Sequence, residues 1–92
     1  MPSIRLRRRH RLDHEAAIDA VNRIANQLAS EYGVRIRWQD NNVLSFERPS
    51  LSGHIAVHED DIEIDASVGL SLVFFRQDIE REIDRLIETE FT

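Results

Sequence analysis

The sequence lacks several residue types, and each absence excludes a class of protein. It has no cysteine, which excludes a disulfide scaffold, a thiol nucleophile and a thiolate metal site. It has no lysine, so all 12 basic residues are arginine. No apolar run approaches the roughly 18 residues of a membrane-spanning helix, and no apolar stretch follows the basic N-terminus as in a secretory signal. We therefore expect a soluble, cytoplasmic protein.

The composition is typical of one small folded domain. The 92 residues are 41% hydrophobic and 32% charged, which is too apolar for intrinsic disorder. We expect a single domain over residues 1–92 with a modest core. The net charge of −5 is unevenly placed, because residues 1–37 carry +4 and residues 38–92 carry −9. Such a split indicates either a basic arm for nucleic acid or pairing between the two halves.

Hydropathy patterning predicts five strands and two helices. Apolar and polar residues alternate, as in half-buried strands, over residues 4–9, 34–39, 43–47, 54–58 and 61–65. A helical stripe runs from an N-cap at Asp13 to about Tyr32 and stops at Gly33. A second helix is predicted from about Ser71 to Glu90, with Leu72 and Phe75 in its core stripe.

This order predicts an α+β two-layer sandwich, β-α-β-β-β-β-α. Four consecutive strands with short turns form an antiparallel meander, and both helices should lie on the one apolar face of the sheet. The outward residues then place the first strand beside the fifth, because three arginines on one would face three acids on the other. The predicted strand order is 1-5-4-3-2. The facing residues are Arg5, Arg7 and Arg9, and Asp61, Glu63 and Asp65.

The arginine-rich stretch over residues 5–11 is a candidate nucleic-acid site. The acidic strand neutralises half of these charges and leaves Arg8, His10 and Arg11 as the unpaired basic patch. However, the protein is acidic overall, and no aromatic residue stands between the arginines to stack on bases. Structural pairing is therefore the preferred interpretation, and nucleic-acid binding is an alternative.

Catalytic and metal sites find little support in the sequence. His54 and His58 lie roughly 13 Å apart on one strand, too far to hold one ion together. His10 and His14 have no evident third ligand. There is no G-x-S-x-G turn and no glycine-rich phosphate loop. We expect no enzyme activity, catalytic residue, metal or cofactor.

The apolar stretch from Val68 to Phe75 is the clearest functional clue. If the last helix covers it, Leu70, Val73 and Phe74 fall off the core stripe. Exposed apolar clusters usually mark a binding or association surface. We expect these three residues to form an apolar docking or homodimer patch, or else a loop packed on the sheet edge. A second candidate is a pocket between the last helix and the sheet near Trp38, Phe46 and Phe75.

The chain also resembles a small bacterial family, the polyhydroxyalkanoic acid system proteins. The resemblance rests on the order and spacing of the segments IRLRR with His10 and Leu12, LASEYG, RW, LSFER, SGHI and IEREIDR. It implies a role at polyhydroxyalkanoate storage granules and no defined catalytic residues. The order of elements also resembles TATA-binding-protein-like and helix-grip folds, a similarity of fold alone.

The favoured hypothesis is a non-enzymatic accessory protein of polyhydroxyalkanoate storage that is granule-associated or protein-binding. Its expected partners are the granule surface, granule proteins or a second copy of the chain. The first alternative is a small apolar-ligand-binding, helix-grip-like domain. The second is nucleic-acid binding through the arginine run.

Overall fold

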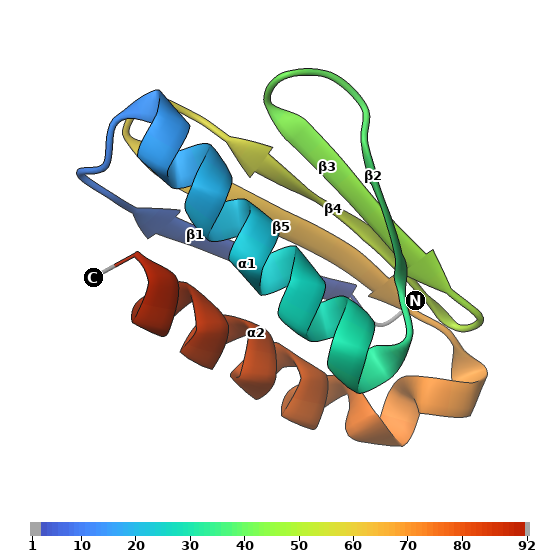
Figure 1. The fold of residues 1–92 in the computed structure, drawn as a ribbon. Coiled ribbons are helices and arrows are strands. Elements are labelled where there is room, and N and C mark those ends of the chain that lie inside the picture. The colour runs from blue at the N-terminus through green and yellow to red at the C-terminus, as the bar shows by residue number, and fades with distance from the viewer. Residues whose placement is uncertain (1–2, 92) are drawn as a thin grey trace.

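A computed structural model describes residues 3–91 as an α+β fold, and the predicted order of elements is confirmed (Figure 1). The elements are β1 (Ser3–Arg9), α1 (His14–Tyr32), β2 (Arg35–Trp38), β3 (Val43–Arg48), β4 (Leu51–Val57), β5 (Asp61–Val68), the 3-10 helix η1 (Leu70–Phe75) and α2 (Arg76–Glu90). The five strands form one antiparallel sheet in the order β1-β5-β4-β3-β2, as predicted. Among residues 3–91, no helix is long and apolar enough to cross a membrane.

Opposite charges face each other across β1 and β5. Arg5 lies opposite Asp65 in the register, and Arg7 lies opposite Glu63. The Arg7 Nη2 atom is 2.7 Å from Glu63 Oε1, and Arg5 Nε is 3.5 Å from Asp65 Oδ2. Each opposite-charge pair across a sheet contributes roughly 0.2–1 kcal/mol. Part of the excess positive charge near the N-terminus is therefore paired with acidic residues of the same sheet.

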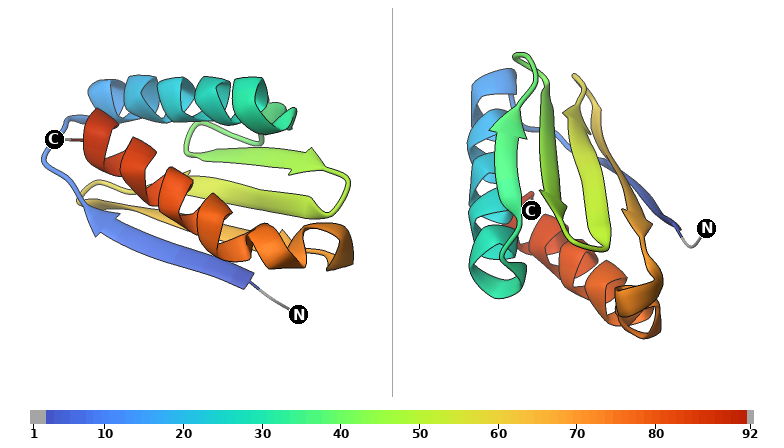
Figure 2. Two further views of the ribbon diagram at one scale, coloured as in Figure 1. Left: turned by 90° about the horizontal axis from the view of Figure 1, so that it is seen from below. Right: turned by 90° about the vertical axis from the view of Figure 1, so that its right-hand side faces the viewer.

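Both helices cover the same face of the sheet and enclose one core (Figure 2). Helix α1 contacts β2 and β4, and α2 contacts β1. The buried side chains of the helices are Ala17, Ala20, Val21, Ile24, Ala25 and Leu28 of α1, and Ile79, Ile83, Leu86 and Ile87 of α2. The opposite face of the sheet carries the charged ladder and lies bare.

The ends of α1 follow from local chemistry, as the sequence predicts. The Asp13 side chain accepts a hydrogen bond from the Ala16 amide at 2.8 Å, which satisfies one of the free N–H groups of the first turn. Gly33 adopts a left-handed conformation with φ 70°, and its amide donates to the Ala29 carbonyl. These two caps position the helix over the sheet.

Three predicted boundaries are wrong. β5 continues to Val68 rather than ending at residue 65, because Ser67 and Val68 still pair with β4. β4 begins at Leu51 rather than at residue 54, because the chain turns tightly at Ser50, whose φ is +68°, and resumes pairing at once. α2 begins at Arg76 rather than near Ser71, because residues 70–75 wind into the tighter η1. Phe75, predicted to lie in the core stripe, is 54% exposed.

A carboxylate pair at the contact between α1 and α2 gives a first testable prediction. Arg85 donates two hydrogen bonds to Glu82, at 2.7 and 2.9 Å, and thereby lowers the pKa of Glu82 to about 2. The neighbouring carboxylate of Glu82 raises the pKa of Glu31. A folded-state pKa below the unfolded value means that the contribution of Glu82 to stability is present above about pH 4.5 and is lost as the pH falls through about 2.

We expect Glu82→Gln to lower the free energy of unfolding at pH 7 by about 1 kcal/mol, the upper end for an ion pair with a solvent-exposed arginine. The difference from the unsubstituted protein should shrink as the pH falls toward 2. The control is Glu31→Gln, which removes a like charge and should leave stability at pH 7 equal or higher. Urea unfolding at several pH values measures both. An equal loss in the two variants would contradict this assignment.

Candidate functional site

The 3-10 helix η1 presents large apolar side chains to solvent. Leu70 is 90% exposed and Phe74 is 92% exposed, while Val73 is half-buried. Phe75 adds a half-exposed ring. Side chains three residues apart eclipse in a 3-10 helix, so Leu70 and Val73 share one direction. We call Leu70, Val73, Phe74 and Phe75 the apolar turn.

Hydrogen bonds hold η1 against the sheet. The Gly69 amide donates to the Ser50 carbonyl at 2.8 Å, and the hydroxyls of Ser50 and Ser71 hydrogen-bond to each other. Gly69 is close to Ser50, since an added Cβ would lie 3.2 Å from the Ser50 Cα. Leu72 points the other way and packs against the core. Because η1 is fixed at both its start and its inner face, its exposed side chains cannot turn inward without breaking these contacts.

The three residues of the predicted pocket lie in different parts of the fold. Phe46 is 2% exposed and lies in the core. Trp38, on the edge strand β2, donates from Nε1 to the Asn22 side chain of α1 at 3.0 Å. Phe75 lies in the apolar turn beyond the end of β5 and is partly open to solvent. The exposure of Phe75 corrects the expectation that it faces the interior.

The predicted basic patch is largely used in structural contacts. Arg8 forms an ion pair with Asp84 of α2, so it is not unpaired. His10 is buried: its Nδ1 accepts from the Leu12 amide at 3.1 Å, and its Nε2 lies 3.0 Å from the His58 carbonyl. A neutral imidazole with its proton on Nε2 satisfies both bonds. Arg11 is left exposed and forms no ion pair among residues 3–91.

The contacts of Arg8 and His10 were not predicted, because both depend on segments that are distant in the sequence. Alternation along β1 turns the Arg8 side chain toward α2, where it pairs with Asp84, but the sequence alone does not show which helix lies over which strand. The ring centroid of His10 also lies 5.3 Å from that of Phe91, so the segment after β1 contacts the residue after α2. The predicted pairing within the protein thus extends beyond the sheet.

The bare face of the sheet brings Ser45, His54 and Asp65 side by side on three neighbouring strands. The geometry is not that of a nucleophilic relay. The Ser45 hydroxyl donates to the Arg37 carbonyl at 3.2 Å and accepts from the Gln39 side chain at 2.8 Å. Within residues 3–91, no hydrogen bond joins His54 to either neighbour. These residues line a shallow, open hollow.

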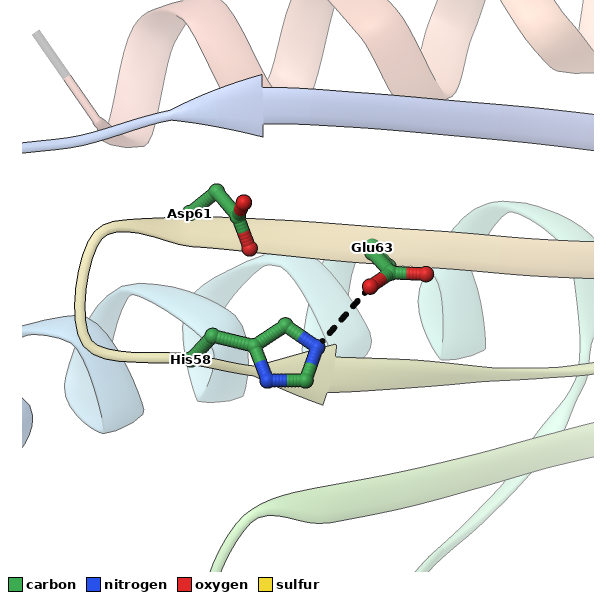
Figure 3. Close-up of side chains that lie close together, drawn as sticks. All are labelled: His58, Asp61 and Glu63. Carbon is green, nitrogen blue, oxygen red and sulfur yellow. Dashed lines mark ion pairs between the residues drawn. The ribbon is translucent and has the colours of Figure 1, made fainter.

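A second cluster on the same face was missed by the sequence argument. His58, Asp61 and Glu63 place one ligand atom each within 4.8 Å of one another (Figure 3). His58 Nε2 lies 3.0 Å from Glu63 Oε1. The β4–β5 hairpin, closed by the His58 amide donating to the Asp61 carbonyl at 2.8 Å, brings the three together. The sequence pattern pairs His58 with His54 and His10 with His14, but it does not show that the turn after β4 places His58 beside the acids of β5.

The sequence of the chain matches a known protein family. The family model described as "Putative polyhydroxyalkanoic acid system protein" matches residues 4–91, which is nearly the whole described chain. The chain belongs to this family. The resemblance inferred from the sequence is therefore confirmed.

Among solved structures, the chain is similar to the NMR structure of PA4090 from Pseudomonas aeruginosa. The two share 11% sequence identity and a TM-score of 0.52, over 94% of this chain and 84% of that one. At this identity the likeness concerns the fold alone. No protein with a curated description matches the chain in sequence. The likeness to TATA-binding-protein-like and helix-grip folds stays a prediction.

Proposed function

We propose that this protein is a non-enzymatic accessory protein of polyhydroxyalkanoate storage that docks on the polyester granule through its apolar turn. The observation that carries the proposal is the exposure of Leu70 and Phe74, at 90% and 92%, on a turn that hydrogen bonds pin to the sheet. Membership of the polyhydroxyalkanoic acid system family supports an apolar polymer surface as the partner. The charged face of the sheet would remain in water.

The size of the apolar turn favours a soft apolar surface over a second protein chain. One aromatic side chain buries roughly 150–250 Å². Leu70, Phe74 and Phe75 therefore offer on the order of 400–500 Å², whereas a stable protein interface needs about 800 Å² from each partner. A small protruding wedge can instead insert between polymer or surfactant chains, which close around it. A homodimer through this turn is the alternative that the test must exclude.

The affinity should be modest and reversible. Burying one large apolar side chain contributes about 1.5–3 kcal/mol, and part of this is offset by the lost freedom of the bound protein. A single acyl chain gives membrane binding that is likewise marginal and reversible. We therefore expect exchange between granule and solution rather than permanent coating.

Co-sedimentation of the purified protein with polyhydroxyalkanoate particles tests this proposal. We expect saturable binding that sodium sulfate strengthens and dilution reverses, because the contact is hydrophobic. Polar silica particles of equal area are the control and should leave the protein in the supernatant. Equal binding to both particles, or no binding to the polyester, would overturn the proposal. Sedimentation equilibrium of the free protein tests the homodimer alternative.

A further inference from the structure

The cluster of His58, Asp61 and Glu63 has a chemistry that the proposed function does not use. It combines one imidazole nitrogen with two carboxylates on the bare face of the sheet (Figure 3). Imidazole and carboxylate together are the donor set of zinc and related divalent transition metals, whereas calcium and magnesium prefer oxygen alone. The cluster lies at the His58–Asp61 end of β5, whereas η1 follows the other end of that strand.

The spacing of the three side chains suits one small ion. Zinc binds nitrogen and oxygen at about 2.0–2.2 Å, so its ligand atoms stand roughly 3.3–3.6 Å apart in a tetrahedral site. His58 Nε2 and Glu63 Oε1 already lie 3.0 Å apart, and the whole set falls within 4.8 Å. A rotation of the Asp61 side chain would be needed to close the remaining gap. The three ligands leave the fourth position to water.

Two further observations point to a cation at this place. Asp61 Oδ1 is buried and has no hydrogen-bond partner among residues 3–91, a state that costs about 1–3 kcal/mol or more for a charged group. The guanidinium of Arg7 already lies between the acids, with Nη2 2.7 Å from Glu63 Oε1 and Nε 3.3 Å from Asp61 Oδ2. One positive charge facing two carboxylates leaves a net negative site, and Arg7 is 65% exposed, so it is free to swing away.

We infer that His58, Asp61 and Glu63 form a binding site for a divalent transition-metal ion of the zinc class, which competes with Arg7 for the two carboxylates. The bound ion joins the end of β4 to the start of β5. It satisfies Asp61 and takes the place of the contact between His58 Nε2 and Glu63 Oε1. Arg7 acts as the resident counter-charge whenever the ion is absent.

Calorimetric titration of the full chain with zinc chloride tests this inference, with thermal unfolding as the second readout. We expect one ion per chain, a higher melting temperature with zinc, and no comparable effect of calcium. His58→Ala should weaken binding at least tenfold. The matched control is His54→Ala, four residues earlier on the same exposed face, which should bind within about twofold of the unsubstituted protein.

Arg7→Gln separates a metal site from a merely electrostatic one. Removing the competing guanidinium should tighten zinc binding severalfold, although the same change weakens the β1–β5 ladder. Equal losses in His58→Ala and His54→Ala would overturn the site, as would weaker binding in a folded Arg7→Gln variant. The absence of any heat or melting shift at millimolar zinc would also overturn it. None of these outcomes bears on granule docking, because the apolar turn is at the other end of β5.

Discussion

Phe74→Asp should reduce binding to polyhydroxyalkanoate particles by more than a hundredfold. The substitution removes one of the two most exposed apolar side chains and requires a carboxylate to be desolvated at the polymer surface. The lost burial costs about 1.5–3 kcal/mol, and moving an unpaired charge out of water costs more. A loss of about 2.8 kcal/mol already corresponds to a hundredfold change in affinity. Co-sedimentation over a range of particle concentrations measures this loss.

Phe74→Asp should leave the stability of the fold almost unchanged. Phe74 is 92% exposed, so substitution there should alter the free energy of unfolding by no more than about 0.5 kcal/mol. The matched control is Gln77→Asp, which adds the same charge three residues further along without removing an aromatic ring. Gln77→Asp should bind nearly as well as the unsubstituted protein, and Phe74→Leu should retain most of the binding. If folded Phe74→Asp and Gln77→Asp lose binding equally, charge rather than the apolar turn decides attachment.

Gly53→Ala should be the most damaging conservative change in the sheet. Gly53 pairs with Phe46 on one side and Ala66 on the other, in the interior of β4. A Cβ added there would lie 2.4 Å from the Asp65 carbonyl oxygen and 2.8 Å from the Ala66 Cα, both of them backbone atoms. The strands would have to separate, so we expect a loss of about 3 kcal/mol, near the upper end for overpacking. In a domain of this size the melting temperature should fall by roughly 12–24 °C.

Gly33→Ala provides the control for this prediction. Gly33 has φ 70° and no atom within 4 Å of an added Cβ, so the change costs only the left-handed conformation, about 1–2 kcal/mol. Thermal and urea unfolding of the two variants therefore separate a steric clash from a backbone preference. A Gly53→Ala variant as stable as Gly33→Ala would mean that β4 and β5 are not packed as closely as described.

The strand order of the sheet can be predicted because two independent signals in the sequence agree. The alternation of apolar and polar residues sets which side chains point outward, and the charges of those side chains then indicate which strands are neighbours. The predicted pairing of the first and fifth strands is observed, with Arg5 opposite Asp65 and Arg7 opposite Glu63. The ends of α1 are equally predictable, because Asp13 and Gly33 each satisfy the free backbone groups at the ends of the helix.

The candidate sites are less predictable, because they depend on contacts between distant segments. A helical period of 3.6 assigns Phe75 to the core, but the 3-10 winding of η1 rotates it outward. That winding depends on the contact of Gly69 with Ser50, which no local pattern shows. The cluster of His58, Asp61 and Glu63 depends in the same way on how the β4–β5 hairpin closes.

The most direct test of granule docking is the location of the protein in cells that accumulate polyhydroxyalkanoate. A fluorescent fusion should colour the rims of the storage granules, and the Phe74→Asp version should spread evenly through the cell at equal abundance. Even distribution of the unsubstituted fusion in granule-filled cells would contradict the account, as would granule rims that Phe74→Asp leaves unchanged.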